Sequence, residues 1–80
     1  MVKNNVRPTS YILCFYDENG SEVRSEAYPM HKYSLDDIFN LLKGKESTCD
    51  IWLGRFSKRR GKYIPTNLAY IWENEAWIKK

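Results

Sequence analysis

The sequence lacks any long hydrophobic run. Its longest uninterrupted apolar stretch, Tyr11–Tyr16, has six residues, whereas a membrane-spanning helix needs about 20. Residues 1–10 carry Lys3 and Arg7, but the apolar region of roughly 7–15 residues that defines a secretory signal does not follow them. We therefore expect a cytoplasmic protein that does not enter a membrane.

Cysteine and histidine are also scarce. Two cysteines are too few for a disulfide scaffold, and Cys14 and Cys49 form no C-x-x-C pair. Both lie in apolar segments typical of strands, which favours small buried core residues; a disulfide or a reactive thiol are the alternatives. The single histidine, His31, lies in a polar connection, so no histidine pair is present to bind zinc. We expect no metal site.

The residue constellations that enzymes need are missing as well. A cysteine nucleophile would have to be exposed beside His31 to be activated, and both cysteines lie in apolar surroundings. The adjacent carboxylates Asp36 and Asp37 are explained by helix capping. The four glycines are isolated from one another, so no glycine-rich loop can cradle a phosphate. The sequence predicts a non-enzymatic protein without a cofactor.

Aromatic side chains, by contrast, are abundant: three Trp, six Tyr and three Phe among 80 residues. A chain of this length forms one domain, which buries only roughly 60% of the surface that the unfolded chain exposes. Each aromatic ring can bury about 150–250 Å² and so compensates for the small core. We predict a single domain over residues 1–80, with residues 1–9 flexible.

The first half of the chain predicts a β-hairpin. Residues 10–17 are apolar on both faces, as in a strand inside a sheet. The DENG segment, 17–20, is typical of a turn, and residues 22–28 alternate between polar and apolar. A three-residue loop would place Val23 and Ala27 on the face of Leu13 and Phe15, and a two-residue loop on the face of Ile12 and Cys14. Both registers stay open, with the three-residue loop favoured.

A helix follows over residues 35–43. Ser34 is a good N-cap, acidic residues occupy the first turn, and Gly44 ends the helix. We expect its apolar stripe to pack on the sheet. The stripe consists of Leu35, Ile38, Leu41 and Leu42.

The second half predicts further strands. Residues 49–57 form a strand, 58–61 a turn and 62–65 the start of a return strand. Pro65 cannot donate a ladder hydrogen bond, so we expect that strand to be short or at an edge. Residues 66–80 fit a hairpin with facing Trp72 and Trp77, or a helix; aromatic strand propensity favours the hairpin. The result is an α+β domain of ββαβββ order with a mostly antiparallel sheet and one packed amphipathic helix.

Charge is distributed unevenly along the chain. Residues 1–40 carry four basic and six acidic side chains, or −2, whereas residues 41–80 carry nine and four, or +5. A cluster of cations and aromatics surrounds the predicted turn at 58–61. Its members are Arg55, Phe56, Lys58, Arg59, Arg60, Lys62 and Tyr63. Cations contact phosphates and rings accept stacked bases, so the cluster predicts docking on nucleic acid or a nucleoprotein complex.

Three other interpretations stay open. Charged turns also keep hairpin tips soluble. Alternatively, the chain binds a protein partner: Trp, Tyr and Arg anchor such interfaces, and Trp72 and Trp77 are the candidates, with Trp77 expected to be partly exposed. A sheet edge could also pair two copies into a homodimer.

In size and layout only, the chain resembles the small accessory proteins that phages and mobile elements encode against host machinery, anti-CRISPR inhibitors among them. The resemblance rests on a single compact α+β domain without catalytic motifs and covers no specific residues. It implies a stoichiometric inhibitor and places no site on the sequence.

Overall fold

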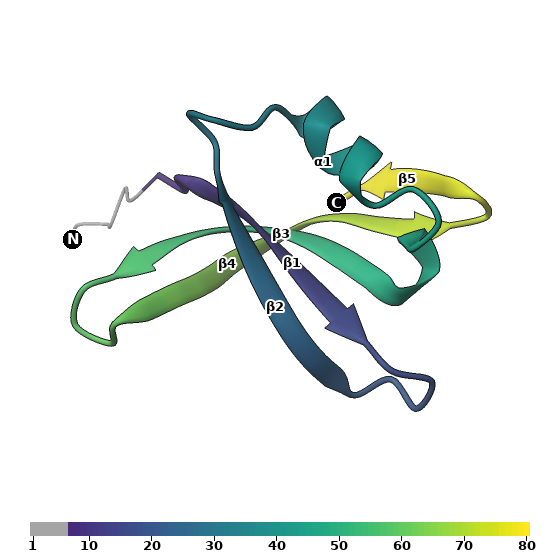
Figure 1. Cartoon of the computed structure of the whole chain (residues 1–80), viewed down its shortest axis with the longest axis horizontal. Helices are drawn as coiled ribbons and strands as arrows, with labels where there is room; N and C mark the ends of the chain where they lie inside the picture. The colour runs from purple at the N-terminus through teal and green to yellow at the C-terminus, as the bar shows by residue number, and fades with distance from the viewer. Residues whose placement is uncertain (1–6) are drawn as a thin grey trace.

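The computed structural model describes residues 7–80 as one antiparallel sheet with a helix on one face (Figure 1). The elements are β1 (Ser10–Tyr16), β2 (Glu22–Pro29), α1 (Leu35–Leu41), the 3-10 helix η1 (Glu46–Thr48), β3 (Cys49–Ser57), β4 (Lys62–Glu73) and β5 (Ala76–Lys79). The strand order is β2-β1-β3-β4-β5. The predicted α+β fold with ββαβββ order is confirmed.

Of the segment 1–9 that we predicted to be flexible, residues 1–6 lie outside the described part of the chain. Thr9 is held at the start of β1 by two backbone hydrogen bonds, donating to Gly54 O and accepting from Met30 N, each 2.9 Å long. In the described part of the chain, no helix has the length and apolarity that crossing a membrane requires.

The β1–β2 hairpin combines features of both registers considered for it. Its loop has three residues, because Asp17 N donates to Ser21 O at 2.9 Å and Gly20 takes a positive φ of 84°. A register shift between Phe15 and Tyr16 then adds one residue on the β2 side, so that Ala27 pairs with Ile12. The favoured placement of Ala27 on the Leu13 face is therefore wrong, because a β-bulge moves the strand by one residue. Val23, at this irregularity, is 58% exposed.

Helix α1 begins as predicted and ends two residues early. Ser34 accepts a hydrogen bond from Asp37 N, and the Asp37 carboxylate accepts one from Ser34 N, forming a capping box. Ile38 and Leu42 are buried, but Leu41 is 46% exposed, so its predicted place in the stripe is wrong. Phe39 packs on the core instead, because positions 35, 38, 39 and 42 share one helical face.

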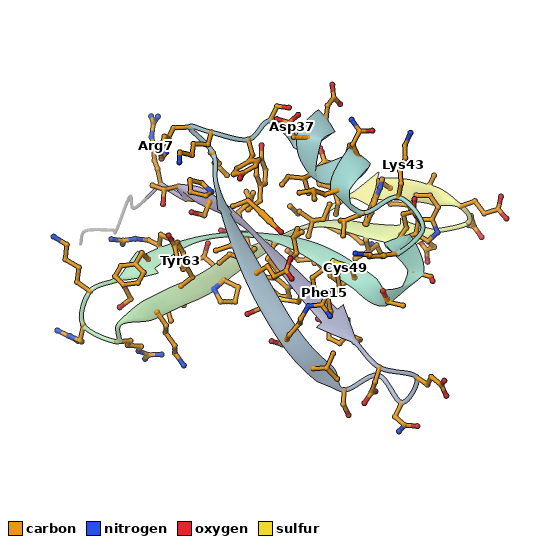
Figure 2. All side chains as sticks on the ribbon, viewed as in Figure 1. Arg7, Phe15, Asp37, Lys43, Cys49 and Tyr63 are labelled. Atoms are coloured by element: carbon orange, nitrogen blue, oxygen red, sulfur yellow. The ribbon has the colours of Figure 1, made fainter. Side chains whose placement is uncertain are left out.

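The core lies between α1 and the sheet. Leu13, Phe15, Cys49 and Ile51 from β1 and β3 contact Ile38 and Leu42. Phe15 and Cys49 are paired across the two central strands (Figure 2).

Both cysteines are buried free thiols, as we predicted for core residues. Burial is the main reason that the pKa of Cys14 rises to about 11 and that of Cys49 to about 12; nearby carboxylates, Asp50 among them, add to the effect. A thiol that stays protonated at neutral pH is a weak nucleophile.

Strand β4 differs from the prediction in length. It has twelve residues and lies between β3 and β5, so the expectation of a short or edge strand is wrong for β4 as a whole. Pro65 nevertheless lies where β4 has β3 on one side only, because β5 pairs with Tyr70–Glu73 alone within residues 7–80. Pro65 pairs with Gly54 next to a register shift. The proline is accommodated by a local edge and a bulge.

The last two strands form the predicted hairpin, and the alternative helix is wrong. Trp72 pairs with Trp77 across it, with ring centroids 5.2 Å apart and an edge-on orientation. The two turn residues, Asn74 and Glu75, have φ values of 54° and 62°, as a tight two-residue hairpin turn requires.

Candidate functional site

The β3–β4 turn presents the basic cluster on a well-defined local frame. Ser57 pairs with Lys62, and Gly61 N donates to Ser57 O at 2.7 Å. The Ser57 hydroxyl accepts a second hydrogen bond from Arg60 N at 3.2 Å. Gly61 has a φ of 68°, a conformation that glycine adopts without steric cost. These bonds hold the backbone of the tip, so its side chains project from a defined turn.

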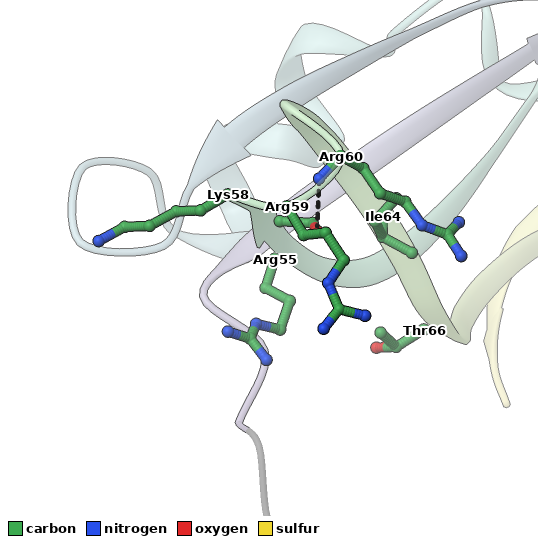
Figure 3. A pocket seen from close by; sticks show the side chains of 7 residues that line it. Arg55, Lys58, Arg59, Arg60, Ile64 and Thr66 are labelled. Carbon is green, nitrogen blue, oxygen red and sulfur yellow. Dashed lines mark hydrogen bonds between the residues drawn. The ribbon is translucent and has the colours of Figure 1, made fainter.

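Four cationic side chains line a hollow of about 610 Å³ on one side of the tip. The guanidinium groups of Arg55 and Arg59 point to the same side, whereas Lys58 points away from them (Figure 3). We call this surface the basic face. It is lined by Arg55, Ser57, Lys58, Arg59, Arg60, Ile64 and Thr66.

Three residues of the basic face were not among the predicted site residues: Ser57, Ile64 and Thr66. The pairing of Ser57 with Lys62 across the predicted turn places Arg55 opposite Ile64. Ile64 could therefore have been predicted as a site residue from the sequence. Thr66 could not be identified from the turn in this way, because the register shift between Leu53 and Gly54 changes the pairing of β4 next to Thr66. Its hydroxyl lies 3.1 Å from Leu53 O, to which it donates.

The cations of the tip have no carboxylate partner in the described part of the chain. The one ion pair within residues 7–80 joins Arg24 and Glu26, with 3.1 Å between Nε and Oε2. The sequence between Ile51 and Glu73 contains no acidic residue. Positive charge therefore accumulates at the tip without internal neutralisation, and such a surface attracts anions over several ångströms.

The predicted aromatic residues lie on the other side of the hairpin. Phe56 pairs with Tyr63, as we predicted, and their ring centroids are 5.1 Å apart in an edge-on arrangement. The rings are 44% and 39% exposed. Successive side chains of a strand point to opposite faces, so this pair, which we call the ring face, is turned away from Arg55. Tyr63 is visible near the tip in Figure 2.

A second hollow, of about 430 Å³, extends from the ring face toward the β1–β2 hairpin. Lys62, Tyr63 and Arg60 line it from the tip, and Cys14, Glu22 and Ser25 are among the residues that line it from the other side. Arg60 and Ile64 thus border both hollows. The predicted cluster is one segment of the chain, but its side chains lie on two surfaces. No acidic residue lines the basic face, whereas Glu22 lines the second hollow.

Three comparisons with known proteins give no match for this chain. The comparisons give no matching family model, and no match among curated proteins or solved structures. The function has to be argued from the surfaces of the molecule itself.

The two candidate interface tryptophans are both half-buried. Trp77 stacks on Phe39 of α1, with centroids 5.6 Å apart and planes 12° from parallel. Trp77 thereby helps to attach the last hairpin to the helix, and its partial exposure agrees with the prediction. The use of Trp72 and Trp77 in a protein interface stays a prediction.

The remaining candidate residues form no metal-binding group in residues 7–80. His31 is exposed in the turn between β2 and α1. Among residues 7–80, histidine, cysteine and carboxylate side chains form no group of three that could hold a metal ion.

Proposed function

We propose that this chain is a non-enzymatic binding protein that docks on nucleic acid, alone or in a nucleoprotein complex, through the β3–β4 tip, residues 55–63. The observation that carries the proposal is the group of four cations on the basic face, which has no carboxylate within ion-pair distance in residues 7–80. Structural cations are usually solvated singly or paired; four around one hollow, with Arg55 and Arg59 pointing to the same side, are suited to a polyanion.

The chemistry of these residues favours phosphate as the group that is bound. Three of the four cations are arginines, whose planar guanidinium can donate two parallel hydrogen bonds to one phosphate. The turn is held by the Ser57 hydrogen bonds, so little backbone entropy is lost when the tip docks. The proposal includes a cytoplasmic location, which the two free buried thiols support.

The test is fluorescence anisotropy with labelled DNA and RNA at about 50 and 200 mM salt. Contacts with three to five phosphates give a slope of log affinity against log salt of about −2.7 to −4.5 on duplex DNA. The double variant Arg59→Ala/Arg60→Ala should weaken binding and reduce the slope by about 1.8, since each phosphate contact contributes about 0.9.

Lys32→Ala/Lys43→Ala is the matched control, because it removes the same charge from two exposed positions on the helix side of the molecule. It should leave the salt slope intact. Absence of salt-dependent binding to every nucleic acid tested contradicts the proposal. The alternative is then the stoichiometric inhibitor of a host protein machine, acting through aromatic and arginine side chains.

A further inference from the structure

The two sides of the β3–β4 tip carry different chemistry. Arg55 and Ile64 face each other on the basic face, and Phe56 and Tyr63 face each other on the ring face. On the ring side, Arg60 and Lys62 line the adjoining hollow beside Tyr63, and Glu22 in the same hollow offsets part of their positive charge. Three of the four cations of the basic face, Arg55, Lys58 and Arg59, therefore lie apart from the rings, and Arg60 is the one cation of that face that lines both hollows.

This separation is unsuited to a single strand. Proteins that hold single-stranded nucleic acid stack its bases on aromatic rings while cations in the same groove follow the backbone. Here a base stacked on Tyr63 would place its phosphate in the hollow that Glu22 shares with Arg60 and Lys62, apart from the other three cations of the basic face. The rings also contact each other edge-on at 5.1 Å, so each already has an aromatic neighbour.

A duplex groove suits the same tip. The major groove of B-form DNA is about 12 Å wide and admits a two-stranded β-ribbon, whose strands are about 4.8 Å apart. The tip projects beyond the crossing with β1 and β2, away from α1 and β5 (Figure 1). The basic face also offers groups that recognise base edges: the Arg55 guanidinium for guanine, the Thr66 hydroxyl, and the Ile64 side chain for a thymine methyl.

Resting on the proposed function, we infer that the ligand is duplex DNA, entered from its major groove, with the basic face toward the base edges. Arg55, Ile64 and Thr66 lie against the bases. Lys58, Arg59 and Arg60, at the turn, contact the flanking phosphates. Duplex RNA is a poorer ligand, because its major groove is too deep and narrow for side chains to read.

The experiment compares a DNA duplex, one of its strands alone and an RNA duplex of the same sequence in anisotropy titrations. The DNA duplex should bind most tightly, and saturation of its minor groove with netropsin should leave the affinity unchanged. Arg55→Ala and Arg55→Lys should each weaken duplex binding by about tenfold, because alanine removes the donors to guanine and lysine does not present the rigid planar fork of arginine. Lys32→Ala/Lys43→Ala, outside the tip, should leave it unchanged.

The outcomes separate this inference from the proposed function. Tighter binding of the single strand, lost in Phe56→Leu/Tyr63→Leu, overturns the duplex inference and keeps nucleic-acid binding. Equal affinity for DNA and RNA duplexes, or displacement by netropsin, also overturns it. Absence of binding to all three ligands overturns both. Circular dichroism of each variant establishes that the sheet is retained, so a loss of affinity reports on the contact.

Discussion

The two ends of the β3–β4 ribbon serve opposite purposes. At one end, Ile51 pairs with Tyr70 under α1, and Ile51 is completely buried. At the other end, Arg55 pairs with Ile64, and the cations around them are exposed and without carboxylate partners in residues 7–80. The comparison teaches that a small domain can obtain its stability from one end of a hairpin and leave the other end free for a ligand.

The boundary between the two ends lies at Gly54 and Pro65. Two register shifts of β3 precede Gly54, between Ile51 and Trp52 and between Leu53 and Gly54, and Gly54 is buried where β3 closely approaches β4 and β1. Bulges increase the local twist of a ribbon. We infer that the twist is the reason that the tip diverges from the part of the sheet that α1 covers.

The largest effect is expected at the covered end. Ile38→Ala should lower the free energy of unfolding by about 2–5 kcal/mol, because it leaves a cavity among Leu13, Leu42 and Ile51. Urea denaturation measures the loss. Leu41→Ala in the same helix is the control and should cost far less, since Leu41 is half-exposed. Similar losses for both variants would contradict the distinction between the two helix faces.

A smaller loss is expected at the boundary. A Cβ at position 54 would overlap the Ile64 carbonyl oxygen and the end of the Ile12 side chain. Gly54→Ala should therefore destabilise the fold by roughly 1–3 kcal/mol, the usual range for overpacking, and should weaken nucleic-acid binding because β3 and β4 must separate. Unchanged stability and affinity would show that the close approach at Gly54 does not couple the packing of the covered end to binding at the tip.

The two buried thiols of the core make the stability of the fold depend on pH. The pKa values of Cys14 and Cys49 are raised in the fold to about 11 and 12, whereas an unfolded thiol titrates near 8.5. The unfolded state therefore loses protons first, and stability is full below about pH 8.5 and falls above it, by up to about 1.4 kcal/mol per pH unit for each thiol. Denaturation between about pH 8 and 10 should show this decline. The Cys14→Ala/Cys49→Ala variant should lack it, and an equal decline in that variant would contradict the assignment.

The smallest effect is expected in the last turn. Glu75 adopts a φ of 62°, which is unfavourable for a residue with a Cβ. Glu75→Gly should raise the melting temperature and stabilise the protein by roughly 0.5–1 kcal/mol, since Asn-Gly is the preferred pair in such turns. Glu73→Gly removes the same charge from a paired strand residue and should destabilise instead. Stabilisation by both variants would indicate a charge effect.

Local signals in the sequence were sufficient for several elements. Ser34 and Asp37 are close enough along the chain to cap α1 without help from elsewhere. The turn at 58–61 and the Trp72–Trp77 pair likewise depend on neighbouring residues. The helical periodicity also identifies Phe39 as a core residue. The prediction of Leu41 instead assigned the apolar stripe to the wrong side of the helix.

What the sequence alone determined about this protein is therefore its local elements, its uneven charge and the cationic turn. Tertiary structure alone decided the bulge that re-registers β2, the position of Pro65, and the placement of Glu22 across from Tyr63. The bulge and the pairing of Pro65 depend on the register between paired strands, and Glu22 and Tyr63 come from hairpins that are distant in sequence and meet only in the sheet, so no pattern within one strand encodes them. The pairing of β3 with β4 likewise set Arg55 and the Phe56–Tyr63 rings on opposite faces of one short segment.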